Sequence, residues 1–253
     1  MESTCDLTKL NSRYILKNIF DIANKYKSFE IFRYNKSFQE KLGVNVKDYK
    51  EYSQTSSPIE IEIIPSEKKE GKIFNSIEEN DQSYYHVYFD DNNEESETHN
   101  LEKGDNVSKI RLIIDPEVQS FNHLFEDCKS IETINFKRFS RINIEDMRGM
   151  FWQCSSLKEV NMNKFKTDNV TNMSWMFYRC SLLKKINIAN CNIDNVTRMT
   201  GMFWGCSSLE EVNLPKFKDD NEINKRCMFT ECSDELKNKI KEENKNIGDE
   251  AFE

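Results

Sequence analysis

Five cysteines stand 26 residues apart in the second half of the chain, and thiols in such a row could bind a metal or form disulfides. They are Cys128, Cys154, Cys180, Cys206 and Cys232. Zinc needs four ligands that converge at about 2.3 Å, and side chains in a line cannot surround an ion. Disulfides fail as well if the cysteines lie more than about 7 Å apart at Cα. We therefore interpret these residues as reduced, buried small hydrophobes, and we predict no metal and no cofactor.

Other residue types that could do chemistry are scattered. His86, His99 and His123 have no second His or Cys three or four residues later. The acidic run 90–97 lacks the turning glycine of a calcium loop, so we interpret it as a solvated hairpin loop. The chain has no G-x-S-x-G motif, no glycine loop for phosphates and no paired carboxylates in a credible pocket. These observations predict a protein that is not an enzyme.

Composition excludes several classes of partner. The chain has 253 residues, a formal net charge of -8 and a pI near 5.2, whereas a nucleic-acid-binding surface needs a basic face. No apolar run approaches the ~18 residues of a membrane span, and the first ten residues do not resemble a signal peptide. We expect a cytoplasmic protein with no membrane span.

Five phenylalanines share the spacing of the cysteines, three residues ahead of each one. They are Phe125, Phe151, Phe177, Phe203 and Phe229. A fixed period of this size is typical of a solenoid, in which one supersecondary unit stacks on copies of itself. In the unit 150–175, Leu157, Val160, Met162 and Phe165 have the L-x-x-L-x-L-x-x-F spacing of a leucine-rich repeat, which predicts a short strand.

The rest of each unit has the apolar spacing of a helix. Met147, Met150, Phe151 and Cys154 occupy positions i, i+3, i+4 and i+7, and Thr171 and Thr197 are candidate helix N-caps in later units. Strands stack at roughly 4.8 Å whereas helices need about 8–10 Å, so the solenoid should bend with its helices outside. The predicted fold class is therefore an α/β leucine-rich-repeat solenoid preceded by a small α+β unit.

Two rows of side chains are candidate protein-binding residues. The first row, Trp152, Tyr178 and Trp204, follows the repeat phenylalanines, so the rings should be partly exposed in register. Alternatively, the three rings stack on one another and shield that side. The second row lies on the polar strand face, which could hold a partner or simply be solvated. Its residues are Lys158, Asn161, Lys184, Asn187, Glu210 and Asn213. We expect the asparagines to hydrogen-bond along the stack.

We divide the chain into four parts. Residues 1–50 have helical apolar spacing, and residues 51–104 contain two predicted strands, 59–64 and 84–89, with the acidic loop. A further strand near 110–113 begins the repeat block, residues 105–232. Residues 233–253 should form a capping helix and tail.

The motifs DNVTNM at 168–173, MFYRC at 176–180 and MFWGCSSL at 202–209 resemble the 26-residue repeat of the BspA-like leucine-rich repeat family of bacterial surface proteins. That resemblance implies a solenoid for protein contacts or adhesion. The segments ILKNIF at 15–20 and NKSF at 35–38 resemble an F-box. We hypothesise a non-enzymatic interaction protein whose partner and oligomeric state are unknown. The alternatives are an F-box-type substrate receptor of a cullin ubiquitin ligase and a surface adhesin exported by an unrecognised route.

Overall fold

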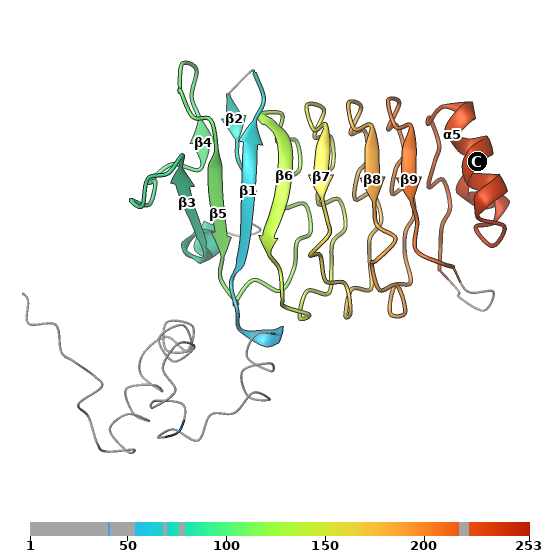
Figure 1. Cartoon of the computed structure of the whole chain (residues 1–253), viewed down its shortest axis with the longest axis horizontal. Coiled ribbons are helices and arrows are strands. Elements are labelled where there is room, and N and C mark those ends of the chain that lie inside the picture. The colour runs from blue at the N-terminus through green and yellow to red at the C-terminus, as the bar shows by residue number, and fades with distance from the viewer. Residues whose placement is uncertain (1–39, 41–53, 68–69, 76–78, 218–222) are drawn as a thin grey trace, which may run out of the picture.

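The computed structural model of the chain describes residues 40, 54–67, 70–75, 79–217 and 223–253, and its regular structure is mostly β. Figure 1 shows the strands side by side along the long axis of the molecule, with one helix at the C-terminal end. The strands are β1 Ile59–Pro65, β2 Gly71–Lys72, β3 Tyr85–Phe89, β4 Asn100–Leu101, β5 Ile110–Ile114, β6 Ile131–Arg138, β7 Glu159–Asn161, β8 Lys185–Asn187 and β9 Glu211–Asn213. The helix is α5, Asp234–Glu243, and two short 3-10 helices span Glu79–Tyr84 and Asp249–Ala251.

The alternation of apolar residues predicts the front strands correctly. Every second residue of β1 is buried, beginning with Ile59, and β5 has the same pattern. Alternate side chains of a strand point to opposite faces, so one face of each strand enters the core. The strands predicted over 59–64, 84–89 and 110–113 are confirmed as β1, β3 and β5.

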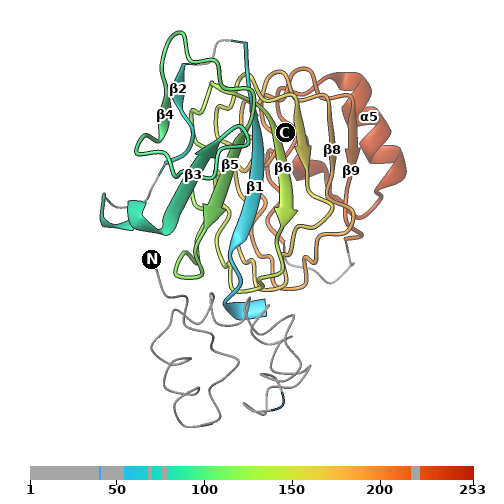
Figure 2. The same cartoon turned by 60° about the vertical axis from the view of Figure 1, so that its left-hand side comes forward.

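The front strands and the first repeats share one sheet, ordered β3-β5-β1-β6-β7. β1 runs antiparallel to both of its neighbours, and Ile61 lies opposite Leu112 on one side and Phe136 on the other. From β6 onward the pairing is parallel. Figure 2 shows β3, β5 and β1 at the near end of this sheet. Buried residues of the front strands and of the repeats form one hydrophobic core.

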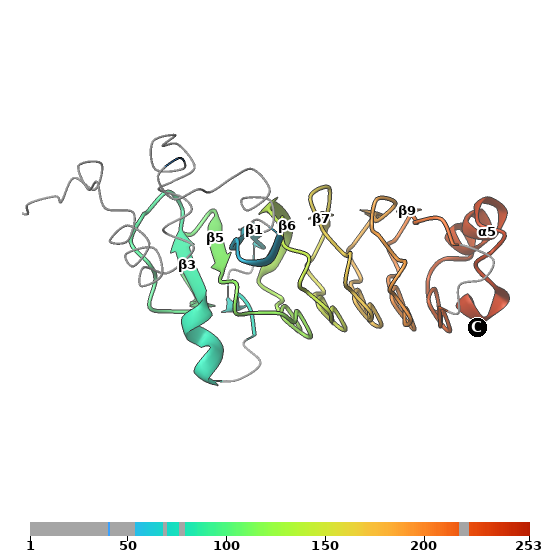
Figure 3. The same ribbon diagram turned by 90° about the horizontal axis from the view of Figure 1, so that it is seen from below.

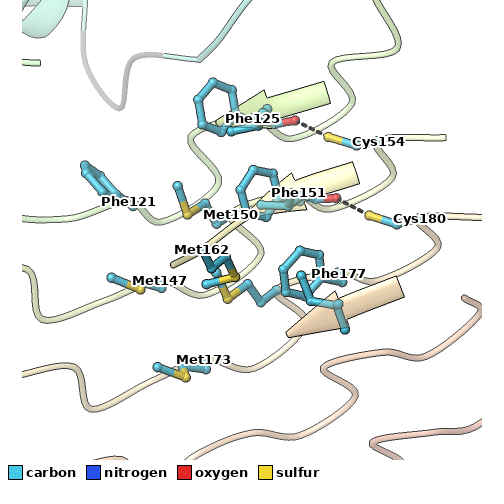
Figure 4. Close-up of a cluster of buried hydrophobic side chains, with 14 of the residues drawn as sticks. Phe121, Phe125, Met147, Met150, Phe151, Cys154, Met162, Met173, Phe177 and Cys180 are labelled. Carbon is cyan, nitrogen blue, oxygen red and sulfur yellow. Dashed lines mark hydrogen bonds between the residues drawn. The ribbon is translucent and has the colours of Figure 1, made fainter. Parts of the chain in front are cut away.

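Successive repeats stack in register behind the strands. Parallel bridges join Ser120, Asp146, Asn172, Arg198 and Asn224 in one line. The rings of the five phenylalanines are buried and stack with centroid separations of 5.5, 5.1, 5.6 and 5.4 Å. Figure 4 shows three of these rings lying over one another, with methionines beside them. The 26-residue period of the sequence therefore marks the positions that meet in the core.

The returning arm of each repeat is not helical, and the prediction of outer helices is wrong. Within an arm, Met150 N–H donates to the carbonyl of Met147 and Cys154 N–H donates to that of Phe151, and each bond closes a four-residue turn. The arms also bond to one another, since Phe151 N–H donates to the carbonyl of Met176 in the next repeat at 2.8 Å. Figure 3 shows the arms as a row of irregular coils without helical ribbon.

Consecutive turns bury apolar residues at the same i, i+3, i+4 and i+7 spacing from which the helix was predicted. Each arm contains two residues with positive φ, for example Gly149 at 59° and Gln153 at 56°, and a right-handed helix cannot contain them. The arms also lie too close for helices, which need about 8–10 Å between axes. Thr171 and Thr197 are not N-caps, because their hydroxyls donate to the carbonyls of Glu145 and Thr171 in the preceding repeats.

The predicted fold class is therefore wrong as a whole. The described part is mostly sheet with one substantial helix, its main sheet is mixed, and it has no convex layer of helices. β8 and β9 form a separate pair, so the repeat strands do not make one continuous parallel sheet either. A leucine-rich-repeat solenoid does not describe this molecule.

The cysteine row is buried and donates hydrogen bonds. Four of the five thiols reach the carbonyl of a phenylalanine one repeat back, with Sγ to O distances of 2.8 Å for Cys154, 3.1 Å for Cys180, 3.0 Å for Cys206 and 3.2 Å for Cys232. Figure 4 marks the first two of these bonds. The Cys128 thiol donates instead to the carbonyl of Glu126 at 3.7 Å. Burial raises the pKa of the Cys154, Cys180 and Cys206 thiols well above the ordinary value. Protonated thiols therefore link adjacent arms.

The C-terminal residues cover the last repeat. α5 begins at the N-cap Ser233, whose side chain accepts a hydrogen bond from Leu236 N–H, and the helix buries Leu236 and Ile240. Beyond it, the carbonyl of Ala251 accepts from Phe229 N–H at 2.8 Å, and the Phe252 ring stacks on Phe229 at 5.7 Å. The tail thus pairs with the last arm as another repeat would.

The F-box-like segments, 15–20 and 35–38, lie outside the described residues. None of the described helices has the length and apolar character needed to cross a membrane.

Candidate protein-binding surfaces

The aromatic row predicted from the sequence is one packed cluster on the outer side of the arms. Trp152, Tyr178 and Trp204 are each half-buried. The Trp152 and Tyr178 ring centroids lie 4.1 Å apart, and those of Tyr178 and Trp204 lie 6.3 Å apart. The three rings therefore contact in sequence along the stack, as the alternative interpretation expected, while each keeps part of its surface in solvent.

A fourth ring, Trp175, belongs to this cluster, and the sequence analysis did not predict it. Its centroid lies 5.8 Å from Trp152, 5.5 Å from Tyr178 and 5.6 Å from Trp204. We call Trp152, Trp175, Tyr178 and Trp204 the aromatic cluster. Its rings meet at angles from 32° to 79°, so they pack edge to face or tilted.

Glycine on the neighbouring arm makes room for Trp175. A Cβ atom placed on Gly201 would lie 2.2 Å from the Trp175 ring, and one on Gly149 would lie 2.6 Å from the His123 ring. In the repeat register, the four residues alternate as His123, Gly149, Trp175 and Gly201. This alternation of large residue and glycine is the signal in the sequence that could have identified Trp175.

Charged groups border the aromatic cluster. The Arg179 guanidinium carbon lies 5.2 Å from the Tyr178 ring centroid, a cation–π distance. At the front end, His123 Nδ1 lies 3.1 Å from Glu126 Oε2, and its ring lies 5.9 Å from Trp152. The Trp204 Nε1 atom is buried and has no hydrogen-bond partner among the described residues.

The strand face forms a groove of about 600 Å³. Five of the six residues predicted on this face line it together: Lys158, Asn161, Lys184, Asn187 and Asn213. Glu210 is exposed but does not line the groove, and its N–H donates to the carbonyl of Lys184 at 2.9 Å. We call this feature the β7–β8 groove, because most of its lining comes from 158–163 and 184–187.

The sequence predicted hydrogen bonds between the asparagines of successive repeats, and this prediction is wrong for Asn161 and Asn187. The side-chain oxygen of Asn161 accepts from Asn163 N–H, and that of Asn187 accepts from Ala189 N–H, both at 3.1 Å. Each is an Asx turn that ends its own strand. The amide nitrogens of Asn161 and Asn187 make no hydrogen bond within the described residues.

A second hollow, of about 420 Å³, lies over the front sheet, and its two lysines are paired with carboxylates. Lys137 Nζ lies 2.8 Å from Glu62 Oε1, and Lys109 Nζ lies 2.7 Å from Asp91 Oδ1. Arg111, which also lines this hollow, lies over the Tyr88 ring at 4.3 Å. These contacts occupy the groups that a ligand would need, so the hollow is a weaker candidate site than the β7–β8 groove.

Outside these surfaces, His86 bridges two carboxylates, with Nδ1 2.9 Å from Glu95 and Nε2 3.2 Å from Asp115. Burial alone would lower the pKa of His86, but its bonds to Glu95 and Asp115 raise it overall. Within the described ranges, His, Cys, Asp and Glu residues form no group of three or more that could hold a metal ion.

The repeats match a different family model from the one that their motifs suggested. Residues 119–242, just under half of the chain, match the model of a family described as "Mycoplasma protein of unknown function, DUF285". No curated protein matches the chain. No solved structure matches it either.

These results correct the resemblances drawn from the sequence. The matching family model covers the same repeats whose motifs resembled the BspA-like leucine-rich repeat, and it is not a leucine-rich repeat or F-box model. The terms leucine-rich repeat, solenoid and BspA-like therefore do not apply to this chain. The F-box resemblance has no support from the family comparison.

Proposed function

We propose that this chain is a non-enzymatic interaction protein that binds a partner protein through the outer side of its stacked arms. The observation that carries the proposal is the aromatic cluster, in which four half-buried rings from three successive repeats form one surface. Trp, Tyr and Arg are the residues that most often dominate the energy of protein interfaces. Arg179 adds the third of these types beside Tyr178.

The packing of the cluster also favours binding over simple shielding. Each ring is held by its neighbours, so little side-chain entropy remains to be lost when a partner covers it. The β7–β8 groove is a second surface that could contribute to the same function.

The proposal is tested by affinity capture with the intact protein, from an extract of the cells that express it. We expect the double variant Trp152→Ala/Trp204→Ala to recover at least about tenfold less of the partner than the wild type, because each lost aromatic anchor is worth 1 kcal/mol or more. Leu182→Ala is the matched control, since Leu182 is 45% exposed and outside the cluster.

The double variant should remain folded. Trp204 carries a buried N–H that finds no partner in the described part of the chain, so its removal eliminates an unfavourable group along with the ring contacts. Equal recovery of the same proteins by the wild type and a folded double variant, judged by circular dichroism, would contradict the proposed function.

A further inference from the structure

β3 is an edge strand of the main sheet, at the end that Figure 2 brings forward. The Tyr84 carbonyl, just before β3, accepts from Asp115 N–H on the side of β5. By alternation, the backbone groups of Val87 point to the outer edge, where the Val87 carbonyl accepts from Ser96 N–H at 2.7 Å. Residues 93–98, which belong to the loop after β3, therefore cover part of this edge.

The loop 93–98 is held on β3 by polar contacts and not by burial. All of its residues except Ser96 are exposed. Besides the bond from Ser96 N–H, an ion pair joins the loop to the strand, with Glu95 Oε1 at 2.9 Å from His86 Nδ1. A segment with so little buried apolar surface opens at a low free-energy cost. The loss of either contact should therefore shift the loop toward its open state.

The His86 ring lies between two carboxylates, and only its protonated form can donate to both. Its Nε2 atom lies 3.2 Å from Asp115 Oδ2, opposite the contact with Glu95. A neutral imidazole has one N–H, and its other ring nitrogen is an acceptor. The Glu95 side chain is 49% exposed and that of Asp115 is 22% exposed, so solvent screens the Asp115 contact less. A neutral ring should keep its proton toward Asp115 and turn an acceptor nitrogen toward the Glu95 carboxylate.

Other charged groups on the neighbouring strands have different partners. Arg111 of β5 lies over the Tyr88 ring at 4.3 Å. Burial lowers the pKa of Arg141 to about 10, and the charges of Glu117 and Asp115 oppose that effect. Neither arginine supplies a bond to Glu95 in the described structure, so His86 is the cation that holds the loop.

The other histidine near the loop titrates on the opposite side of the ordinary value. The His99 ring stacks on Phe74 at 4.7 Å, and burial lowers its pKa below 6.5 although the charge of Glu95 opposes this. Burial would lower the pKa of His86 as well, but its bonds to Glu95 and Asp115 raise it above 6.5 overall. A change at the loop on the alkaline side of 6.5 is therefore assigned to His86.

We infer that His86 is a pH-sensitive latch, whose protonated ring holds residues 93–98 on the outer edge of β3 and whose deprotonation releases them. Release frees the Val87 carbonyl and uncovers a strand edge, which is a template for pairing with a strand of another molecule. The latch goes beyond the proposed function and does not depend on it, because it lies outside the aromatic cluster and the β7–β8 groove.

The test is amide hydrogen exchange of the full chain by NMR, read at Ser96 N–H and corrected for the intrinsic exchange rate at each pH. Because the folded-state pKa of His86 is raised, the latch is complete at low pH and is lost as pH rises through that value. We expect the protection of Ser96 to fall about threefold to fivefold, as suits a partly exposed ion pair. The midpoint should coincide with the titration of the His86 ring nitrogens in the same samples.

Two variants separate the latch from general charge effects. In Glu95→Gln, the side-chain amide can accept from the protonated ring or donate to the neutral ring, so the pH dependence at Ser96 should disappear. The matched control is Glu97→Gln, which removes the same charge from an exposed carboxylate of the same loop. It should keep the pH dependence of the wild type.

Three results would overturn the inference. They are a protection of Ser96 that does not change with pH in the wild type, a pH dependence that survives in Glu95→Gln, and one that disappears in Glu97→Gln.

Discussion

The repeats and the front sheet bury their apolar residues through contacts of different range along the chain. In the repeats, each residue meets its counterpart 26 positions away, as Thr171 and Thr197 do through their hydrogen bond. In the front sheet, Ile61 meets Leu112 and Phe136, which follow no common interval. Stability in a stack is close to a sum of repeats and their interfaces, whereas the front sheet must form many distant contacts together.

The largest test of this comparison is removal of a ring from the middle of the stack. Phe177→Ala should lower the free energy of unfolding by about 3–5 kcal/mol, because Phe177 is fully buried between Phe151 and Phe203. Urea unfolding followed by circular dichroism measures the change. The matched variant is Phe252→Ala, whose half-buried ring stacks on one neighbour only, and its loss should be smaller. Equal losses at the two positions would contradict the nearest-neighbour description.

A second test of the comparison concerns the position in the arms where large residues alternate with glycine, at Trp175 and Gly201. Gly201→Ala should cost about 1–3 kcal/mol, because Gly201 has a φ of 59° and an added Cβ would strike the Trp175 ring. In the background Trp175→Ala, the same change should cost less, since only the backbone strain remains. Thermal or urea unfolding of the four proteins in this cycle measures the coupling. Purely additive effects would show that glycine does not make room for the ring.

The smallest expected effect belongs to the front sheet and depends on pH. The folded-state pKa of His86 is raised, so its contribution is fully present below the unfolded value of about 6.5 and is lost as pH rises through the folded value. For partly exposed ion pairs the contribution should be below about 1 kcal/mol.

The measurement is urea unfolding of the wild type and His86→Gln on both sides of that pH range. The difference between the two proteins should shrink as pH rises. This comparison also removes the opposite contribution of His99, whose pKa burial lowers, because both proteins retain that residue. A difference that grows with pH would contradict the assignment of Glu95 and Asp115 as its partners.

The sequence predicted the repeat core well because one period fixes which residues meet. Phe125 to Phe229 stack as their spacing implied, and the strands at β6 to β9 fall where apolar alternation placed them. The arms were mispredicted because turns and helices place apolar residues at the same intervals. Glycine at Gly149 and Gly201, both with positive φ, was the local evidence against a helix.

The front sheet could be predicted strand by strand but not in its order. Alternation identified β1, β3 and β5, yet nothing in the residues 59–65 indicates that they lie between β5 and β6. In the candidate surfaces, too, the residues at repeated positions were predicted and a residue present in one repeat only was not. Five strand-face residues were found from the repeat, whereas Trp175 was missed because only one arm has an indole at that position.

The tail of the chain satisfies the last arm as a further repeat would, through the bonds from Phe229 N–H to Ala251 and from Cys227 N–H to Glu250. Because both end structures meet an ordinary arm, the number of arms between them is not set by either end. A deletion of one whole 26-residue period, such as 178–203, would restore the stacking of the repeat phenylalanines, but it would place Cys227 instead of Gly201 beside the Trp175 ring. The phenylalanine stack therefore tolerates a change of length in whole periods, whereas the fit of Trp175 against glycine restricts which period can be removed.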